Sequence, residues 1–128
     1  MTYLLDTHTF LSILNTPEAL PTQVLKIAMD RSAVLLVSIA TPWEMAIKVA
    51  SGKLDAADIL DDFEGVLGRG RFTTLETAIR QVTRGGRLPL HHRDPFDRLL
   101  AAQALELRIP LISRDQVFDL YGVQRIWD

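Results

Sequence analysis

The 128-residue chain contains no cysteine, so it has neither a disulfide framework nor thiolate ligands for a metal. This absence suits a reducing cytoplasm. No apolar run approaches the roughly 20 residues that a membrane-spanning helix requires, and we expect no contact with membranes. The N-terminal stretch MTYLLDTHTFLSIL has no basic segment and carries Asp6 in its middle, so we do not expect a signal peptide. These absences favour a cytoplasmic globular protein.

The composition is that of one globular domain, which we expect to span residues 1–128. Apolar residues make up 48% of the chain, and the formal net charge is only −2, so the protein as a whole is not a polycation. The charges are nevertheless segregated along the sequence. An acidic block covers residues 55–64, and residues 69–98 contain seven arginines and only three acids. The arginine-rich segment is either a phosphate-facing patch or a solvated surface.

Strand and helix patterns alternate along the chain. Apolar or β-branched runs predict strands at residues 3–5, 34–37, 72–75 and 110–113, and a last, edge strand at 123–127. Helical spacing of apolar residues predicts helices at 10–14, 20–30, 43–50, 59–67, 78–83 and 94–108, several of them ended by glycine (Gly52, Gly68, Gly70, Gly85 and Gly86). This alternation predicts an α/β sandwich with a mostly parallel central sheet.

The segment RDPFDRLLAAQA, residues 93–104, places two carboxylates at the start of a helix that is apolar on nearly every side. A structural interpretation is available for both. Asp94 is a good N-cap ahead of Pro95, and Asp97 falls at the third helical position, where it meets the positive end of the helix dipole and can reach back to the cap. Capping alone therefore explains this pair, and the rest of the chain must decide whether the acids do more.

Four acids from distant segments are predicted to meet at one edge of the sheet. Asp6 follows the first strand, Asp115 follows the strand at 110–113, Glu44 lies in the helix after the second strand, and Asp97 opens the helix that leads into residues 110–113. The carboxyl ends of parallel strands share one edge, and ligands bind there. Each acid also has a capping interpretation, with Thr41 as the cap of the helix that contains Glu44.

Like charges at close range are unfavourable unless a cation lies among them. We see no lysine or cysteine accompanying the four acids, and hard oxygen ligands suit Mg²⁺ or Mn²⁺. We do not expect a histidine metal site, because His91 and His92 precede the Asp94 cap in a predicted surface loop and His8 stands alone. Two tryptophans, Trp43 and Trp127, are expected in the core or at an interface rather than as stacking platforms for bases.

Three motifs resemble one known family. They are LLDTH near the start, WEMAIKVASGKL in the middle and LPLHHRDPFDRLLAAQALELRIPLISRD near the end. Together, in this order, they resemble the PIN-domain ribonucleases, and among these the VapC-type toxins of toxin–antitoxin pairs. The resemblance implies a flavodoxin-like three-layer α/β/α sandwich and a metal-dependent endoribonuclease. It also implies a homodimer, and a VapB-type or similar antitoxin that covers the active groove in a heterotetramer or larger complex.

The resemblance also implies roles for individual residues. The four family acids fall on Asp6, Glu44, Asp97 and Asp115, with Thr7 and Ser113 as the accompanying hydroxyls. We assign Asp6 and Asp97 as core ligands of Mg²⁺ or Mn²⁺, with Glu44 and Asp115 as ligands directly or through water. Three further residues flank these positions: Arg98 and Arg114, which would hold substrate phosphate or orient a carboxylate, and Asp94, mainly a structural cap. Ser113 replaces the commoner threonine of the family.

Two other functional classes need residues that this chain lacks. A phosphatase of the haloacid dehalogenase type needs an Asp two residues after the first one, where this chain has His8. A receiver-type signalling domain needs paired acids after the first strand and a lysine where Arg114 stands. The remaining alternative is a non-catalytic PIN module that only binds RNA or an antitoxin, and a cleavage assay distinguishes it from an enzyme.

Overall fold

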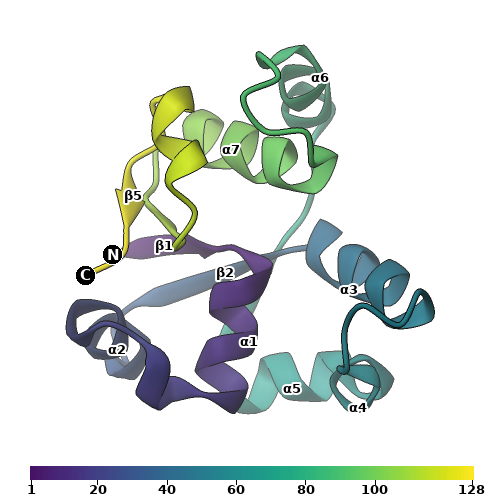
Figure 1. Cartoon of the computed structure of the whole chain (residues 1–128). Helices are drawn as coiled ribbons and strands as arrows, with labels where there is room; N and C mark the ends of the chain where they lie inside the picture. Colours follow the sequence, from purple (N-terminus) through teal and green to yellow (C-terminus); the bar gives the residue numbers. More distant parts are fainter.

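A five-stranded, fully parallel sheet runs through the centre of the computed structural model, which describes all residues 1–128 (Figure 1). The strand order is β3-β2-β1-β4-β5, so the first strand lies in the middle. The strands are β1 (Thr2–Leu5), β2 (Val34–Ser38), β3 (Phe72–Leu75), β4 (Leu111–Ile112) and β5 (Arg125–Ile126). All five predicted strands are confirmed, including the short edge strand near the C-terminus.

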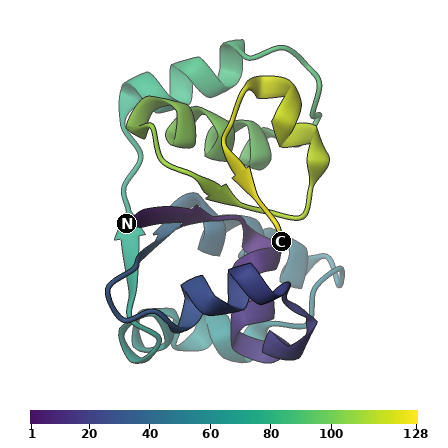
Figure 2. The same ribbon diagram turned by 90° about the vertical axis from the view of Figure 1, so that its left-hand side faces the viewer.

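Helices cover both faces of the sheet, which confirms the three-layer α/β/α sandwich. Figure 1 shows α6 and α7 together on one side and α1, α2 and α5 on the other, and Figure 2 shows the same layers from the side. The helices are α1 (Thr7–Asn15), α2 (Thr22–Met29), α3 (Ala40–Ala50), α4 (Ala57–Asp61), α5 (Phe63–Arg69), α6 (Ile79–Arg87) and α7 (Pro95–Leu107), with 3-10 turns η1 (Pro17–Ala19) and η2 (Gln116–Tyr121). None of these helices has the length and apolar character needed to cross a membrane.

The central strand divides the core into two halves. Successive side chains of a strand point to opposite faces, so Leu4 and Leu5, both fully buried, enter different apolar clusters. Leu5 packs in the cluster of Phe10 and Met45, whereas Leu4 packs in the cluster of Leu100 and other residues of α7. The sheet is thus held from both sides, and its carboxyl-terminal edge is a fixed platform for the residues that follow each strand.

Two of the predicted helices have different boundaries. Residues 59–67 lie in two helices, α4 and α5, which are separated at Asp62. The helix predicted to end before Gly85 continues through Gly85 and Gly86 to Arg87. Gly85 is buried against α7, and a Cβ atom there would lie 3.2 Å from the Cα of Leu99. This glycine therefore serves close helix packing instead of helix termination.

The start of α3 also differs from the prediction. The helix begins at Ala40, whose backbone N–H donates to Ser38 Oγ at 3.2 Å, so Thr41 is not its N-cap. Trp43 is 65% exposed, which contradicts a place in the core, and it meets Phe96 edge-on with ring centroids 5.0 Å apart. The helix buries the face that contains Glu44 and Met45, because Glu44 has polar partners in the interior.

Candidate functional site

Asp6 is fixed at the carboxyl end of the central strand by two hydrogen bonds. One carboxylate oxygen accepts the backbone N–H of Thr9 at 2.8 Å and so caps α1, as the capping interpretation predicted. The other oxygen accepts the hydroxyl of Ser113 at 2.5 Å. Asp6 is only 4% exposed, and its backbone follows β1 directly. The capping role is therefore real, but it occupies only one of the two oxygens.

Ser113 links Asp6 to Asp115. Its hydroxyl oxygen, which donates to Asp6, also accepts the backbone N–H of Asp115 at 3.0 Å. One carboxylate oxygen of Asp115 in turn accepts the backbone N–H of Val117 at 3.0 Å and caps η2. A single buried hydroxyl thus sets the position of two of the predicted acids, which come from opposite ends of the chain.

Glu44 lies on the buried face of α3 with two partners of its own. Thr7 donates its hydroxyl to one Glu44 oxygen at 2.6 Å, and Lys48 Nζ contacts the other at 2.6 Å. The expectation that no lysine accompanies the acids is therefore wrong, because Lys48 lies one helical turn after Glu44. Burial alone would lower the pKa of Lys48, but the hydrogen bond and charge of Glu44, with Asp94 and Asp97, raise it above its ordinary value.

Asp97 opens α7 among other acids. Asp94 caps the helix by accepting the backbone N–H of Phe96 at 2.8 Å, as predicted, but Asp97 turns to His92 and not back to the cap. Burial above all, and then the charge of Asp94, raise the pKa of Asp97 to about 7. Glu44 and Asp6 add to this rise, and His92 partly offsets it. The charges of acids from distant segments therefore act together at Asp97.

The ring of His92 lies between Asp97 and Asp115. Its Nε2 atom is 2.9 Å from a carboxylate oxygen of each. One ligand atom from each of the three residues lies within 4.8 Å of the others, whereas Asp6 and Glu44 are outside this set. The structure thus brings Asp97 and Asp115 together around His92. It joins Asp6 to Asp115 through Ser113.

Sequence reasoning missed His92, which was expected in a surface loop away from the site. The side chain of His92 is only 18% exposed. One local signal was available, because a histidine two residues before an N-cap aspartate can accept that residue's backbone N–H, as His92 does from Asp94 at 3.2 Å. His8 and His91 are exposed, as the loop assignment predicted for His91.

The two flanking arginines differ in their surroundings. Arg98 does not orient a carboxylate: one of its terminal nitrogens, Nη1, donates to the backbone carbonyls of His92 and Arg93, both at 3.0 Å, so it braces the loop before α7. Arg114 is exposed beside a cavity of about 490 Å³ that reaches two of the acids. The cavity is lined by Asp6, His8, Thr9, Ser12, Ala19, Arg114, Asp115 and Trp127.

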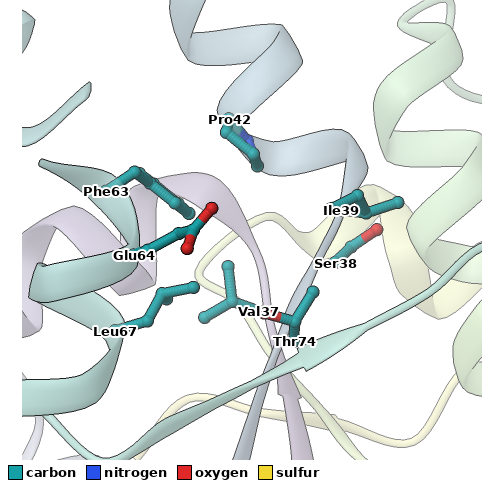
Figure 3. Close-up of a pocket in the computed structure, with 8 residues that line it drawn as sticks. All are labelled: Val37, Ser38, Ile39, Pro42, Phe63, Glu64, Leu67 and Thr74. Atoms are coloured by element: carbon teal, nitrogen blue, oxygen red, sulfur yellow. The ribbon is translucent and has the colours of Figure 1, made fainter. Parts of the chain in front are cut away.

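A second cavity, of about 500 Å³, lies where β2 ends and α3 begins, next to α5. Figure 3 shows its lining, in which Glu64 is the one ionisable side chain; the other residues are Val37, Ser38, Ile39, Pro42, Phe63, Leu67 and Thr74. None of the four predicted acids lines it. It offers a mainly apolar recess and no constellation of reactive groups.

The donor set fits a hard divalent cation such as Mg²⁺ or Mn²⁺. The ligand atoms available from Asp6, Asp97, Asp115 and Glu44 are carboxylate oxygens, which these ions prefer. Asp97 supplies the structural test, because burial and the surrounding acids raise its pKa to about 7. A cation among these carboxylates would remove the electrostatic cost that this shift reflects.

Comparisons with known proteins agree with the observed fold. The family model described as the PIN domain matches residues 3–123. Among solved structures, VapBC2 from Rickettsia felis, bound to a DNA fragment from its promoter, is similar with a TM-score of 0.71 and 16% identity, covering 100% of both chains. VapBC-1 from nontypeable Haemophilus influenzae is similar with a TM-score of 0.67 and 20% identity, and the match covers 98% of this chain and 97% of that one. FitAB bound to the IR36 DNA fragment is similar with a TM-score of 0.61 and 19% identity, and the match covers 97% of this chain and 93% of that one. No curated protein sequence matches significantly.

Proposed function

Because the chain belongs to the PIN-domain family, whose members are generally nucleases, we propose that it is a metal-dependent endoribonuclease and the VapC-type toxin of a toxin–antitoxin pair. The observation that carries the proposal is that Asp97 and Asp115 lie on either side of His92, while Ser113 links Asp115 to Asp6. Capping explains the position of Asp6 and Asp115. It does not explain why Asp97 turns to His92, which also contacts Asp115, at a place where burial and the charges of Asp94, Glu44 and Asp6 raise the pKa of Asp97.

Each residue has a distinct task in this proposal. Asp6 and Asp97 would hold the cation, and Asp115 and Glu44 would complete the site directly or through water. When bound, Mg²⁺ or Mn²⁺ supplies an activated water and charge neutralisation at the phosphate. The chain itself keeps the acids in place, since Ser113 fixes Asp6 and Asp115, and Thr7 and Lys48 fix Glu44. Arg114, which is exposed and lines the same cavity as Asp115, would bind a phosphate of the RNA.

The test is cleavage of a panel of RNAs by the purified chain, free of any partner, in the presence of Mn²⁺ or Mg²⁺. Asp97→Asn and Asp6→Asn should each abolish cleavage. Asp58→Asn removes an exposed acid of α4 outside the cluster and is the matched control, which should cleave like the wild type. Binding of RNA without cleavage by the wild type would favour the alternative, a non-catalytic PIN module.

A toxin of this kind needs an inhibitor, and we propose that the partner fills the site. It would bring a basic side chain to the acids, where an arginine or lysine takes over the charge of the cation. Apolar anchors would bind along α2 and along α4–α5, where the cavity of Figure 3 is a receptor of suitable size. The competing interpretation is that these faces pack within one chain or against a second copy.

Coexpression with the neighbouring small gene tests this proposal. The two proteins should copurify from the cytoplasmic fraction as a heterotetramer or larger complex. We expect this complex to be built on a homodimer of this chain. Exchange of the partner's C-terminal basic residue for Glu should restore RNA cleavage by the complex. A complex that forms and cleaves RNA at the full rate would contradict the site-filling proposal while leaving the nuclease assignment intact.

A further inference from the structure

The hydrogen bonds of His92 define which ring nitrogen carries the hydrogen. The backbone N–H of Asp94 donates to Nδ1 at 3.2 Å, so Nδ1 is an acceptor. In a neutral imidazole one nitrogen accepts and the other donates. The hydrogen therefore lies on Nε2, which is 2.9 Å from both Asp97 and Asp115. His92 is arranged to donate from Nε2 to Asp115 while the same atom also contacts the carboxylate of Asp97.

The backbone around this ring is held by three elements. The His92 backbone N–H donates to the Tyr121 hydroxyl at 2.8 Å, and that hydroxyl donates to the carbonyl of Pro89 at 2.6 Å. Arg98 donates to the carbonyl of His92 from the other side. The ring also lies beside Phe118, with centroids 6.1 Å apart. Its place between the acids is thus set by η2, α7 and the loop that joins α6 to α7.

A histidine that binds a metal has the opposite arrangement. Its ligating nitrogen must present a lone pair, and the other nitrogen donates its hydrogen to a carbonyl or carboxylate. A backbone amide is a donor only, so the Asp94 N–H cannot accept a hydrogen from Nδ1. The proximity of His92 to Asp97 and Asp115 therefore does not make it a third ligand in this conformation.

We propose that the Nε2–H of His92 competes with a divalent cation for the carboxylate oxygens of Asp97 and Asp115, so that a cation would bind these two acids only after the ring has moved away. The inference rests on the proposed function for the presence of a cation at these acids. Its consequence is competition, because the ring and the cation need the same carboxylate oxygens. His92 would then hold the two acids together in the metal-free chain and weaken the affinity for the metal.

The test is Mn²⁺ binding to the full, metal-free chain, followed by electron paramagnetic resonance and calorimetry. His92→Ala removes the hydrogen bond to Asp115 and the ring's contact with Asp97, and it should bind Mn²⁺ about tenfold more tightly, the size expected for the loss of such a competitor. His91→Ala is the matched control, since His91 is exposed and contacts Tyr121, and should bind like the wild type. Unchanged or weaker binding by His92→Ala would overturn the proposal, and weaker binding would identify a nitrogen ligand.

A measurement on the wild-type chain covers the case in which His92→Ala does not fold. Long-range ¹H–¹⁵N correlation spectra distinguish the two ring tautomers. We expect hydrogen on Nε2 without metal, and a changed ring environment with Nε2 still protonated when Mg²⁺ is added. Hydrogen on Nδ1, with or without Mg²⁺, would overturn the proposal. If no variant binds Mn²⁺, the metal site of the proposed function fails as well; if all bind equally, only the role of His92 fails.

Discussion

Replacement of Asp97 by Asn separates a catalytic acid from a structural one. Burial, followed by the charge of Asp94, raises the pKa of Asp97 from 3.8 to about 7. Between these values the folded chain binds more protons at this residue than the unfolded chain does. The contribution of Asp97 to the free energy of unfolding of the metal-free protein therefore falls as the pH rises from about 4 to about 7. Asn carries no charge, so the Asp97→Asn variant should lose this dependence.

The size of the effect follows from the pKa. This rise in the pKa of Asp97, roughly three pH units, changes the free energy of unfolding by at most about 4 kcal/mol, at about 1.4 kcal/mol per pH unit. The side chain is 20% exposed and titrates among other acids, so about half of that is a realistic figure. Loss of a negative charge in the first turn of α7 opposes it by about 0.3–1 kcal/mol. At pH 8 Asp97→Asn should thus be more stable than the wild type by about 1–2 kcal/mol.

The assay is urea unfolding at pH 5 and pH 8 with a chelator, together with RNA cleavage. The advantage of Asp97→Asn should grow from pH 5 to pH 8, and the variant should not cleave RNA. Asp58→Asn, in exposed α4, should follow the wild type at both pH values. An Asp97→Asn protein that is about 1 kcal/mol less stable at pH 8 and fully active would refute the reasoning and leave only the favourable charge of Asp97 in the first turn of α7.

Three further results are expected. Gly85→Ala should lower the free energy of unfolding by about 1–3 kcal/mol, because its Cβ would lie 3.2 Å from Leu99 Cα. Gly86→Ala has no atom within 4 Å of its Cβ and should raise the free energy of unfolding by up to about 1 kcal/mol in the same melts. Equal effects of the two would contradict the close packing of α6 on α7. Lys48→Met should lower the free energy of unfolding by about 1–3 kcal/mol, because it leaves the charge of the buried Glu44 unpaired. In a double-mutant cycle, the added substitution Glu44→Gln should recover part of this loss. Additive effects of the two substitutions would exclude the coupling. Mn²⁺ should raise the melting temperature of the wild type more at pH 8 than at pH 5, because protons compete for the carboxylates, and a constant shift would contradict a site at these acids.

Local signals were strong enough to predict the architecture. The run at residues 34–37 and the Asp94–Pro95 cap predicted β2 and α7 almost to the residue, because buried strands and capped helices have their determinants in adjacent positions. The position of Asp6 and Asp115 just after β1 and β4, at the carboxyl edge of the sheet, followed from the parallel topology. Lys48 was also within reach, since it lies four residues after Glu44 on one helix, and the sequence alone contained that pair.

Features that depend on long-range contacts were not predictable. The burial of Gly85 depends on where α7 lies, so a glycine that normally ends a helix continues one here. The exposure of Trp43 depends on which face of α3 meets the interior, and Glu44 is on that face through Thr7, 37 residues away. The position of His92 depends on Tyr121, which lies 29 residues later in the chain and accepts the backbone N–H of His92.

One measurement tests the central claim most directly. The purified chain, stripped of metal and of any partner, is incubated with an end-labelled RNA panel in EDTA and then with increasing Mn²⁺ or Mg²⁺. The account predicts no cleavage in EDTA, cleavage that saturates as the cation is added, and none at any concentration for Asp97→Asn. Cleavage in EDTA, or undiminished cleavage by Asp97→Asn, would contradict a carboxylate site that acts through a divalent cation.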